Sequence, residues 1–389
     1  MPRRPDSVFT PAFVALTVSD LAYFTAGGAL LGVTPFLVTG PLGSGPTAVG
    51  VAVGAFSAST LLLRPLAGRW VDRHGRRPLL VGGAALFALL VAGHLLVTDL
   101  TSLVVLRLLL GAAEALYVVA GFAALADLAP PGRAGEALSY NSLALFLGIA
   151  AGPSLGQALM ALGGFRAVWV GTALLVGLAA GLAARVPETR DPGAGAAPPA
   201  PLVHRAAVVP GLGLFAGVAA VSGFLAFAAL HADRLGLEVW SSVLAVFGVV
   251  VVACRLLFAS TADHVPPRRL AGTALAVSTG GLAVAAAAPS AWSLFAGAAL
   301  LGVGTAFLTP AVFADVFGRV PPAQRGSAAG TTTAFLDLGY CGGPFMLGLV
   351  AGAAGLPAAF LSGAALTAAG AAVLLSRRRP GAPTHAGSG

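Results

Sequence analysis

The chain has 389 residues, of which 57% are apolar and 9% are charged, with a formal net charge of +8. A soluble domain carries about 25% charged residues, so this composition excludes a water-soluble globular protein and predicts an integral membrane protein surrounded by the lipid bilayer. The positive charge would otherwise suggest nucleic acid as a partner. All 22 basic residues are arginines, and most of them mark one membrane face, so we expect no nucleic-acid partner.

Apolar segments long enough to cross a bilayer recur along the chain. A helix needs about 20 predominantly apolar residues for this. Asp20 interrupts the first segment and no small-residue cleavage site follows it, so we expect a retained span and no signal peptide. We predict an all-α integral membrane protein with twelve transmembrane helices, at roughly 11–38, 47–68, 78–97, 100–126, 136–160, 166–185, 207–232, 239–262, 269–288, 291–317, 326–350 and 355–376.

A segment rich in proline and small residues separates the first six predicted spans from the last six. Such a composition is typical of a linker. We therefore predict four parts, which are an N-terminal six-helix bundle at 1–185, a cytoplasmic linker at 186–206, a C-terminal six-helix bundle at 207–376 and a basic cytoplasmic tail at 377–389.

Arginines gather in the loops on one side of this predicted bundle. If the N-terminus is cytoplasmic, 17 of the 22 arginines face the cytoplasm, whereas Arg166 and Arg234 face outside. Cytoplasmic loops carry an excess of basic residues. We therefore predict a multi-pass protein of the plasma membrane with both termini in the cytoplasm.

The two halves of the sequence repeat each other at an offset of 191 residues. The repeated residues are those that shape turns and helix contacts, and chance does not readily produce so many matches at one offset. Parallel duplication of this kind is typical of transporters whose halves rock around a central site. The matched positions are Arg64 and Arg255, Asp72 and Asp263, Arg77 and Arg268, Gly111 and Gly302, Pro130–Pro131 and Pro321–Pro322, Gly148 and Gly339, and Gly152–Pro153 and Gly343–Pro344.

A short basic loop joins the second and third predicted spans. It reads Gly68-Arg69-Trp70-Val71-Asp72-Arg73-His74-Gly75-Arg76-Arg77-Pro78. Gly75 permits a tight turn and Pro78 suits the start of a helix. The string resembles the signature loop of the major facilitator superfamily, and together with the duplication the resemblance covers essentially the whole chain. It implies the major facilitator fold.

The same resemblance implies a cytoplasmic gate. Asp72 is expected to accept backbone N–H groups at the start of the eleventh helix, near Ser327, where the helix dipole favours an anion. Arg76 is expected to pair with Asp127, and such contacts favour the outward-open state. Alternatively, the arginines only fix the topology. The second copy of the loop keeps Asp263 but lacks the glycine pair, so we expect a weaker gate there. The gate residues are Gly68, Asp72, Arg73, Gly75, Arg76 and Asp127.

Two further segments resemble motifs of the same family. Arg107 and Gly111 match an R-x-x-x-G motif whose arginine the family associates with proton coupling. A glycine–proline motif of the fifth span resembles that of proton-driven antiporters and departs from it at Gln157. Small residues four apart also serve plain helix packing, which stands as the structural alternative. The antiporter-type residues are Gly148, Gly152, Pro153 and Gly156.

Ionisable residues within the spans are candidate proton carriers, because each costs about 2.5–3.5 kcal/mol at bilayer depth. We select Asp20 and Glu114, with Arg107 seven residues before Glu114 on the same span. The alternative is a static ion pair, between Glu114 and Arg107 or between Asp20 and another cation. For Asp337 a structural role and a functional role stay equally open.

Other polar residues within the spans have structural interpretations. Arg64 and Arg255 lie near the cytoplasmic ends of their spans, where long side chains reach the interface. His94 and His231 lie near outer helix ends, and structural roles are favoured over proton transfer.

Spans 1, 4, 7 and 10 line the central cavity in the family that this sequence resembles. A first half with acids and a second half with aromatic side chains favours an amphipathic or lipophilic substrate. The candidate cavity residues are Tyr23, Phe24, Tyr117, Asn141, Phe227 and Phe307.

These observations favour proton-coupled efflux of a small lipophilic or amphipathic compound by a functional monomer. A proton-coupled importer and a sugar or metabolite exporter of the same fold are the alternatives. We expect no enzyme activity, cofactor or metal, because the six histidines are scattered and no Walker-type or dinucleotide loop occurs. A channel is disfavoured by the duplication with its gate loop.

Overall fold

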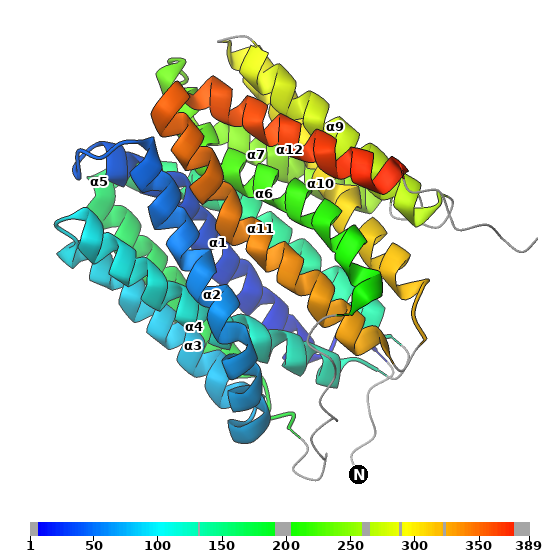
Figure 1. The fold of residues 1–389 in the computed structure, drawn as a ribbon. Helices are drawn as coiled ribbons and strands as arrows, with labels where there is room; N and C mark the ends of the chain where they lie inside the picture. Colours follow the sequence, from blue (N-terminus) through cyan, green and yellow to red (C-terminus); the bar gives the residue numbers. More distant parts are fainter. Residues whose placement is uncertain are drawn as a thin grey trace, which may run out of the picture.

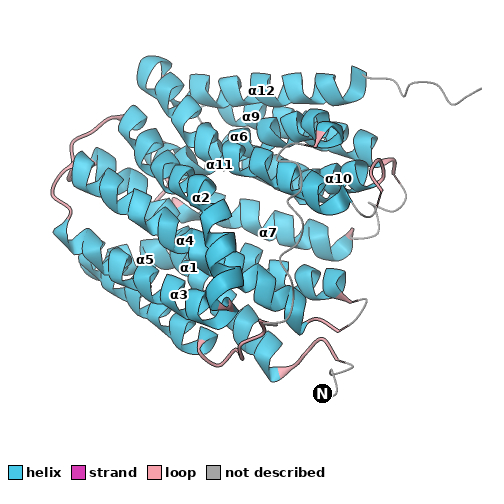
Figure 2. Cartoon of the chain, turned by 60° about the horizontal axis from the view of Figure 1, so that its bottom comes forward, coloured by secondary structure: helices cyan, strands magenta, loops and turns pink. Residues whose placement is uncertain are grey.

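The structure is a computed structural model that describes residues 7–130, 133–190, 204–258, 265–287, 290–321 and 324–376. Its described residues form helices and no strand (Figure 2). The helices are α1 (Pro11–Thr39), α2 (Pro46–His74), α3 (Arg76–Gly93), a short 3-10 helix η1 (His94–Leu96), α4 (Leu100–Leu128), α5 (Ala134–Ala183), α6 (Arg205–Arg234), α7 (Ser241–Leu257), α9 (Pro267–Ala287), α10 (Ala291–Phe317), α11 (Arg325–Ala354) and α12 (Leu356–Ser376).

These helices account for the twelve spans predicted from the sequence. Ten helices in the described residues are long and apolar enough to cross a membrane. One of them, α5, contains two spans, because Gly163 and Gly164 leave helical geometry, with Gly164 at a φ of 63°. The shorter α7 supplies the remaining span and ends at Leu257. The predicted all-α membrane fold is therefore confirmed.

Three helices begin at side chains that cap them. Thr10 precedes Pro11 and accepts the Phe13 N–H at 3.1 Å. Asp99 accepts the Ser102 N–H at 2.9 Å in a capping box that starts α4, and this hydrogen bond lowers the pKa of Asp99. Ser290 starts α10 in the same way. Such caps satisfy the free N–H groups of a first helical turn.

Helices α1 to α5 pack together on one side of the molecule and α6 to α12 on the other (Figure 1). Within the first group α1 packs along α5, and the glycines of the predicted antiporter-type motif lie at this contact. A Cβ added to Gly148 would lie 2.9 Å from Thr25 N, and one added to Gly156 would lie 3.0 Å from Ala29 O. The motif therefore serves close helix packing, whatever else it does.

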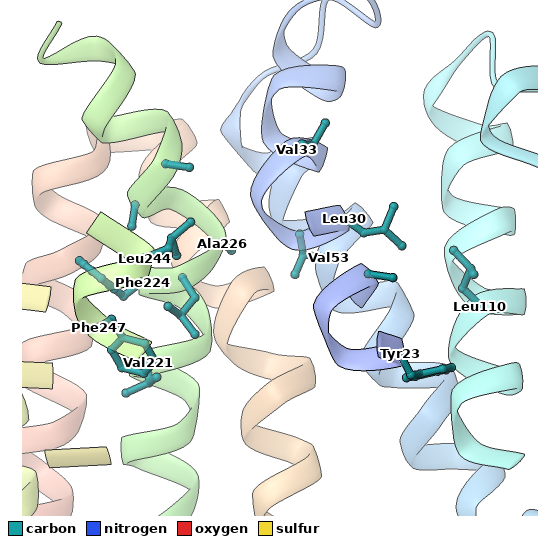
Figure 3. Packing of buried hydrophobic residues seen from close by; sticks show 14 of the residues in the cluster. Tyr23, Leu30, Val33, Val53, Leu110, Val221, Phe224, Ala226, Leu244 and Phe247 are labelled. Atoms are coloured by element: carbon teal, nitrogen blue, oxygen red, sulfur yellow. The ribbon is translucent and has the colours of Figure 1, made fainter. Parts of the chain in front are cut away.

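The interior of each group is apolar and aromatic (Figure 3). Figure 3 shows Tyr23 pointing from α1 toward α4, where Leu110 lies. Phe224 and Phe227 of α6 are fully buried. Burial of such side chains fixes the helices against one another.

The two largest interfaces between the groups are α2 with α11 and α5 with α7, and they repeat each other. Thr47 Oγ1 donates to Gly348 O at 3.3 Å, and Gln157 Nε2 donates to Glu238 O at 2.6 Å. Residues 47 and 238 differ by 191, as do 157 and 348. Each hydrogen bond is therefore the repeat-related copy of the other, although the donors differ.

We call the end of the bundle that carries the Gly75 turn the basic end. The hydrogen bonds of Thr47 and Gln157 lie at the opposite end, because α2 begins there. At the basic end, the side chain of Asp72 is 77% exposed. Most of the predicted linker, the predicted tail at 377–389 and Asp263 lie outside the described residues.

Candidate functional site

Asp20 lies at the centre of a polar cluster that three helices build. Its residue is 5% exposed, on α1. Tyr117 of α4 donates from its hydroxyl to Oδ1 at 2.7 Å, and Asn141 of α5 donates from Nδ2 to Oδ2 at 2.7 Å. Among the residues that the structure describes, no arginine pairs with Asp20. The static ion pair considered for Asp20 is therefore not observed.

A chain of hydroxyl groups leads from Asp20 to the backbone of α5. The Tyr117 hydroxyl lies 2.8 Å from Ser19 Oγ, which donates to Ala179 O at 2.8 Å. A hydroxyl both donates and accepts. With Asp20 ionised, Tyr117 donates to the carboxylate. With Asp20 protonated, the acid can donate to Tyr117, Tyr117 to Ser19, and Ser19 to Ala179 O.

Asn141 is held by a second contact. Thr17 donates from Oγ1 to Asn141 Oδ1 at 3.1 Å, which directs the amide nitrogen toward Asp20. The two neutral donors thus stabilise a carboxylate without supplying a counter-charge. The cluster can hold the acid in both protonation states.

Tyr23 continues the cluster toward Glu114. Its ring stacks on that of Tyr117, with centroids 4.0 Å apart, and Phe24 meets it edge-on at 5.6 Å. The Tyr23 hydroxyl is buried without a hydrogen-bond partner and lies within electrostatic reach of both Asp20 and Glu114. A buried polar atom without a partner is a place for water or substrate.

Glu114 lies on the side of α4 that faces α2. Its Oε2 accepts the hydroxyl of Thr60 at 3.0 Å, and Thr60 also contacts Gly111 O at 3.0 Å. Arg64 is the cation within its electrostatic reach. The ion pair considered between Glu114 and Arg107 is not formed, because seven residues place the two side chains two helical turns apart.

Arg107 belongs to a different neighbourhood from the two acids. It is 5% exposed, and its Nε and Nη2 atoms have no hydrogen-bond partner. It lies within electrostatic reach of His94, whose ring stacks on Trp169 at 4.6 Å and whose Nδ1 lies 3.1 Å from Val91 O. His231 packs edge-on against Phe360. The structure therefore does not bring Arg107 to Asp20 or Glu114.

Arg64 and Asp337 form an ion pair that the sequence did not predict. Arg64 Nη1 on α2 lies 2.8 Å from Asp337 Oδ2 on α11. Besides the membrane interface expected from the sequence, Arg64 thus has an acid partner on the other half, although its Nε atom has no hydrogen-bond partner. Its repeat mate Arg255 lies over the ring of Phe146, 4.2 Å from the centroid.

The aromatic residues predicted for the cavity are mostly packed in the interior. Phe227 is fully buried, close to the α2–α11 interface at Gly348. Tyr23 is 2% exposed and Tyr117 is buried. Phe307 and Phe24 are half-buried. Helix contacts cover the rings of Tyr23, Tyr117 and Phe227 in this structure, and their place in a substrate cavity stays a prediction.

The signature loop is held by a residue that sequence reasoning missed. Glu188, just after α5, accepts the N–H of Arg76 at 2.9 Å and the N–H of Arg77 at 3.1 Å. It thereby places a carboxylate at the N-terminus of α3, as the helix dipole favours. Gly75 has a φ of 101°, and a Cβ there would lie 2.7 Å from Glu188 Cδ. The position of an acid directly after the sixth span, at the basic end, is the sequence feature that points to this role.

Of the other predicted gate residues, Arg76 and Asp127 pair with each other, whereas Asp72, Arg73 and Gly68 make few contacts. Arg76 Nε lies 3.1 Å from Asp127 Oδ2, which also accepts the Thr189 hydroxyl at 2.8 Å. Asp72 lies 3.5 Å from Arg76 Nη1 and faces solvent, not α11. Arg73 is exposed, and Gly68 has open space around it. The helix whose N-terminus receives an anion here is α3, through Glu188.

Replacing Glu188 with alanine should lower stability by about 0.5–1 kcal/mol, since it removes an exposed capping carboxylate. Burial alone would raise the pKa of Glu188, but N–H groups of Arg190, Arg76 and Arg77 hold the pKa below its ordinary value. A lowered pKa contributes stability above the unfolded pKa of about 4.3, and this is lost as pH falls through the folded pKa. Thermal unfolding at about pH 7 and about pH 3.5 should show a difference from wild type that shrinks in acid. Glu238→Ala removes another exposed carboxylate as a control, and an equal effect there would contradict the capping role.

A bundle of repeated halves with buried acids and a basic turn is typical of a polytopic membrane transporter. The sequence profile of the Major Facilitator Superfamily matches residues 13–277 and 241–389. The chain belongs to this family, and the fold expected from the signature loop is confirmed.

Relatives with similar sequences support the same family. An uncharacterised MFS-type transporter of Salmonella typhimurium is 32% identical over 371 residues, covering 91% of this chain and 93% of that protein. A second such transporter, from Burkholderia pseudomallei, is 32% identical over 397 residues, which cover 95% of this chain and 93% of that protein. These relatives point to a transporter and give no substrate.

Solved structures share the fold at low sequence identity. The human organic anion transporter MFSD10 (TETRAN) is 19% identical with a TM-score of 0.71, covering 94% of this chain and 99% of its own. The nucleoside transporter NupG is 13% identical with a TM-score of 0.76, covering 94% and 98%. A bacterial homolog to the human lysosomal transporter Spinster, inward-facing and occupied, is 16% identical with a TM-score of 0.77, covering 93% and 95%.

Proposed function

We propose that this transporter exports a small lipophilic or amphipathic compound in exchange for protons, by alternating access. The cluster around Asp20 is the observation that carries the proposal. The acid is buried, has two neutral donors, and pairs with no arginine in the described part of the chain. A carboxyl group in such a place is a functional site by default.

The proton step uses the hydroxyl chain. Asp20 takes up a proton and donates it to the Tyr117 hydroxyl, and Tyr117 then turns its own hydrogen from Asp20 to Ser19, which donates to Ala179 O throughout. Substrate and proton then compete, because the uncharged acid no longer attracts a polar or cationic group. Glu114 is the second candidate carrier, and the Tyr23 hydroxyl, which has no hydrogen-bond partner, lies within electrostatic reach of both acids.

Orientation follows from the arginines. With the basic end in the cytoplasm of a plasma-membrane protein, both termini are cytoplasmic. The contacts of Thr47 and Gln157 then close the outer side, and the exposed Asp72 belongs to an open inner side. Domains bounded at 1–185 and 207–376 would rock as two bodies in a functional monomer. Arg76 and Asp127 would shape the inner gate, together with Glu188.

Accumulation assays test the direction and the coupling. The protein is expressed in a host that lacks its own efflux pumps, and accumulation of lipophilic dyes and antibiotics is measured with and without a protonophore. We expect lower accumulation than in cells carrying the empty vector, and loss of that difference with the protonophore. Raised accumulation would support the importer instead. A lowered accumulation that the protonophore leaves unchanged would contradict proton coupling.

A further inference from the structure

The ion pair of Arg64 and Asp337 crosses the boundary between the two halves. Arg64 lies on α2 and Asp337 on α11, and their side chains are 28% and 8% exposed. Arg64 also has a buried Nε without a hydrogen-bond partner. When one partner of such a part-buried ion pair loses its charge, the attraction between the two side chains is lost. The state of Asp337 therefore affects how firmly α2 holds α11.

The repeat places an apolar partner at the equivalent point of the other interface. Arg255 is 191 residues after Arg64, and Asp337 is 191 residues after Phe146. Arg255 lies 4.2 Å from the ring centroid of Phe146 across the α5–α7 interface. The two arginines thus make the same contact between halves, one with an acid and one with an aromatic ring. Protons act on the first contact and not on the second, because a phenyl ring does not titrate.

Glu114 is positioned to take over Arg64. It lies on α4 of the same half as Arg64 and within its electrostatic reach, held by Thr60 at 3.0 Å. The groups that face Asp337 are Arg64 from α2, Glu114 from α4, and Tyr340 from α11 itself, with Arg255 of α7 near Tyr340. Arg64 is therefore shared by two acids, one on each half.

We propose that Asp337 is a second proton-binding site, separate from Asp20, and that its protonation releases Arg64 to Glu114 and loosens the α2–α11 interface. The α5–α7 interface keeps its arginine–phenylalanine contact throughout. One of two repeat-related interfaces thus responds to protons and the other does not. This inference rests on the proposed proton-coupled function, which it extends to the boundary between the halves.

Distances between spin labels test the inference on the purified full chain. Cys254 and Cys341 are first replaced by alanine, and labels are attached at Trp70→Cys on α2 and Gly330→Cys on α11. Trp70 is 42% exposed, and a Cβ at Gly330 meets open space. Lowering the pH from about 8 to about 5 should change the ratio of near to far populations at least about tenfold, or about 1.4 kcal/mol.

Variants identify the group that titrates. With Asp337→Asn, the ratio of near to far populations should be the same at both pH values. With Asp337→Glu, the ratio should still change with pH. If Asp337→Asn is not obtained as a monodisperse protein, Arg64→Gln breaks the same pair and carries the same expectation. Asp337→Asn combined with Phe146→Asp moves the acid to the repeat-related position opposite Arg255, so the distance between α2 and α11 should stay insensitive to pH. A wild-type ratio that ignores pH, or a response that Asp337→Asn retains, would overturn the inference.

The measurement uses neither substrate nor gradient, so the two proposals fail separately. A pH response in distances together with protonophore-insensitive accumulation would reject the proton-coupled function alone. Proton-driven export together with pH-insensitive distances would reject the role of Asp337 alone.

Discussion

Substituting Asp20 with asparagine should reduce proton-driven transport to the level of cells without the transporter, with normal expression. Asparagine has nearly the shape of aspartate and keeps an acceptor for Tyr117, whose hydroxyl lies 2.7 Å from Oδ1. It cannot bind a proton, and its amide places a donor opposite the donor of Asn141. The measurement is dye accumulation with and without a protonophore, alongside the amount of protein in the membrane.

Two companion variants separate proton binding from packing at this site. Asp20→Glu keeps a titratable group and should retain part of the proton-driven transport. Tyr117→Phe keeps the stack on Tyr23 but removes the hydroxyl, so transport should persist with a shifted pH profile. If Asp20→Asn transports as wild type does, Asp20 is a structural polar residue and Glu114→Gln becomes the decisive variant.

The membrane fold could be predicted because lipid imposes a length rule. Each span needs enough apolar residues to cross the hydrocarbon, and twelve stretches of the sequence meet that rule. The boundary between the fifth and sixth spans follows from Gly163 and Gly164, where the described backbone leaves helical geometry. The spacing of residues along the chain is therefore sufficient to predict features that depend on one helix alone, such as its length and its ends.

Partners between helices were harder to predict. Helical spacing put Arg107 and Glu114 on one face, but two turns separate them and each has other neighbours, His94 and Thr60. The ion pair of Arg64 with Asp337 joins residues 273 positions apart, which no local pattern shows. The cluster of Asp20 with Asn141 joins α1 to α5, and only the burial cost of an isolated acid pointed to it.

The internal repeat predicts tertiary contacts that single residues do not predict. Phe56 O lies against Gly111, and Phe247 O lies against Gly302, each pair 191 residues from the other. Once one interface is known, the offset gives the second. The positions where the copies differ in chemistry, such as Phe146 and Asp337, are then the positions where the halves have acquired different roles.

Substituting Gly152 with alanine should destabilise the protein by about 1–3 kcal/mol or more, since it forces a methyl group into a packed helix contact. A Cβ at this position would lie 2.7 Å from both Ala29 N and Gly28 C, and closer still to Thr25 O. These are backbone atoms of α1, so no side chain can turn aside, and α1 and α5 must separate. The helix that carries Asp20 would then move away from Asn141, so transport should fall together with thermal stability.

Gly177→Ala is the matched control for this substitution. Gly177 lies on the second span of α5, after the break at Gly163 and Gly164, and a Cβ there meets nothing within 4 Å. Alanine is favoured over glycine within a helix by up to about 1 kcal/mol, so the control should keep or raise stability. Thermal unfolding of both variants in one detergent makes the comparison. If Gly152→Ala unfolds at the same temperature as Gly177→Ala, close packing of α1 on α5 does not limit stability, and the glycine–proline motif needs a functional explanation.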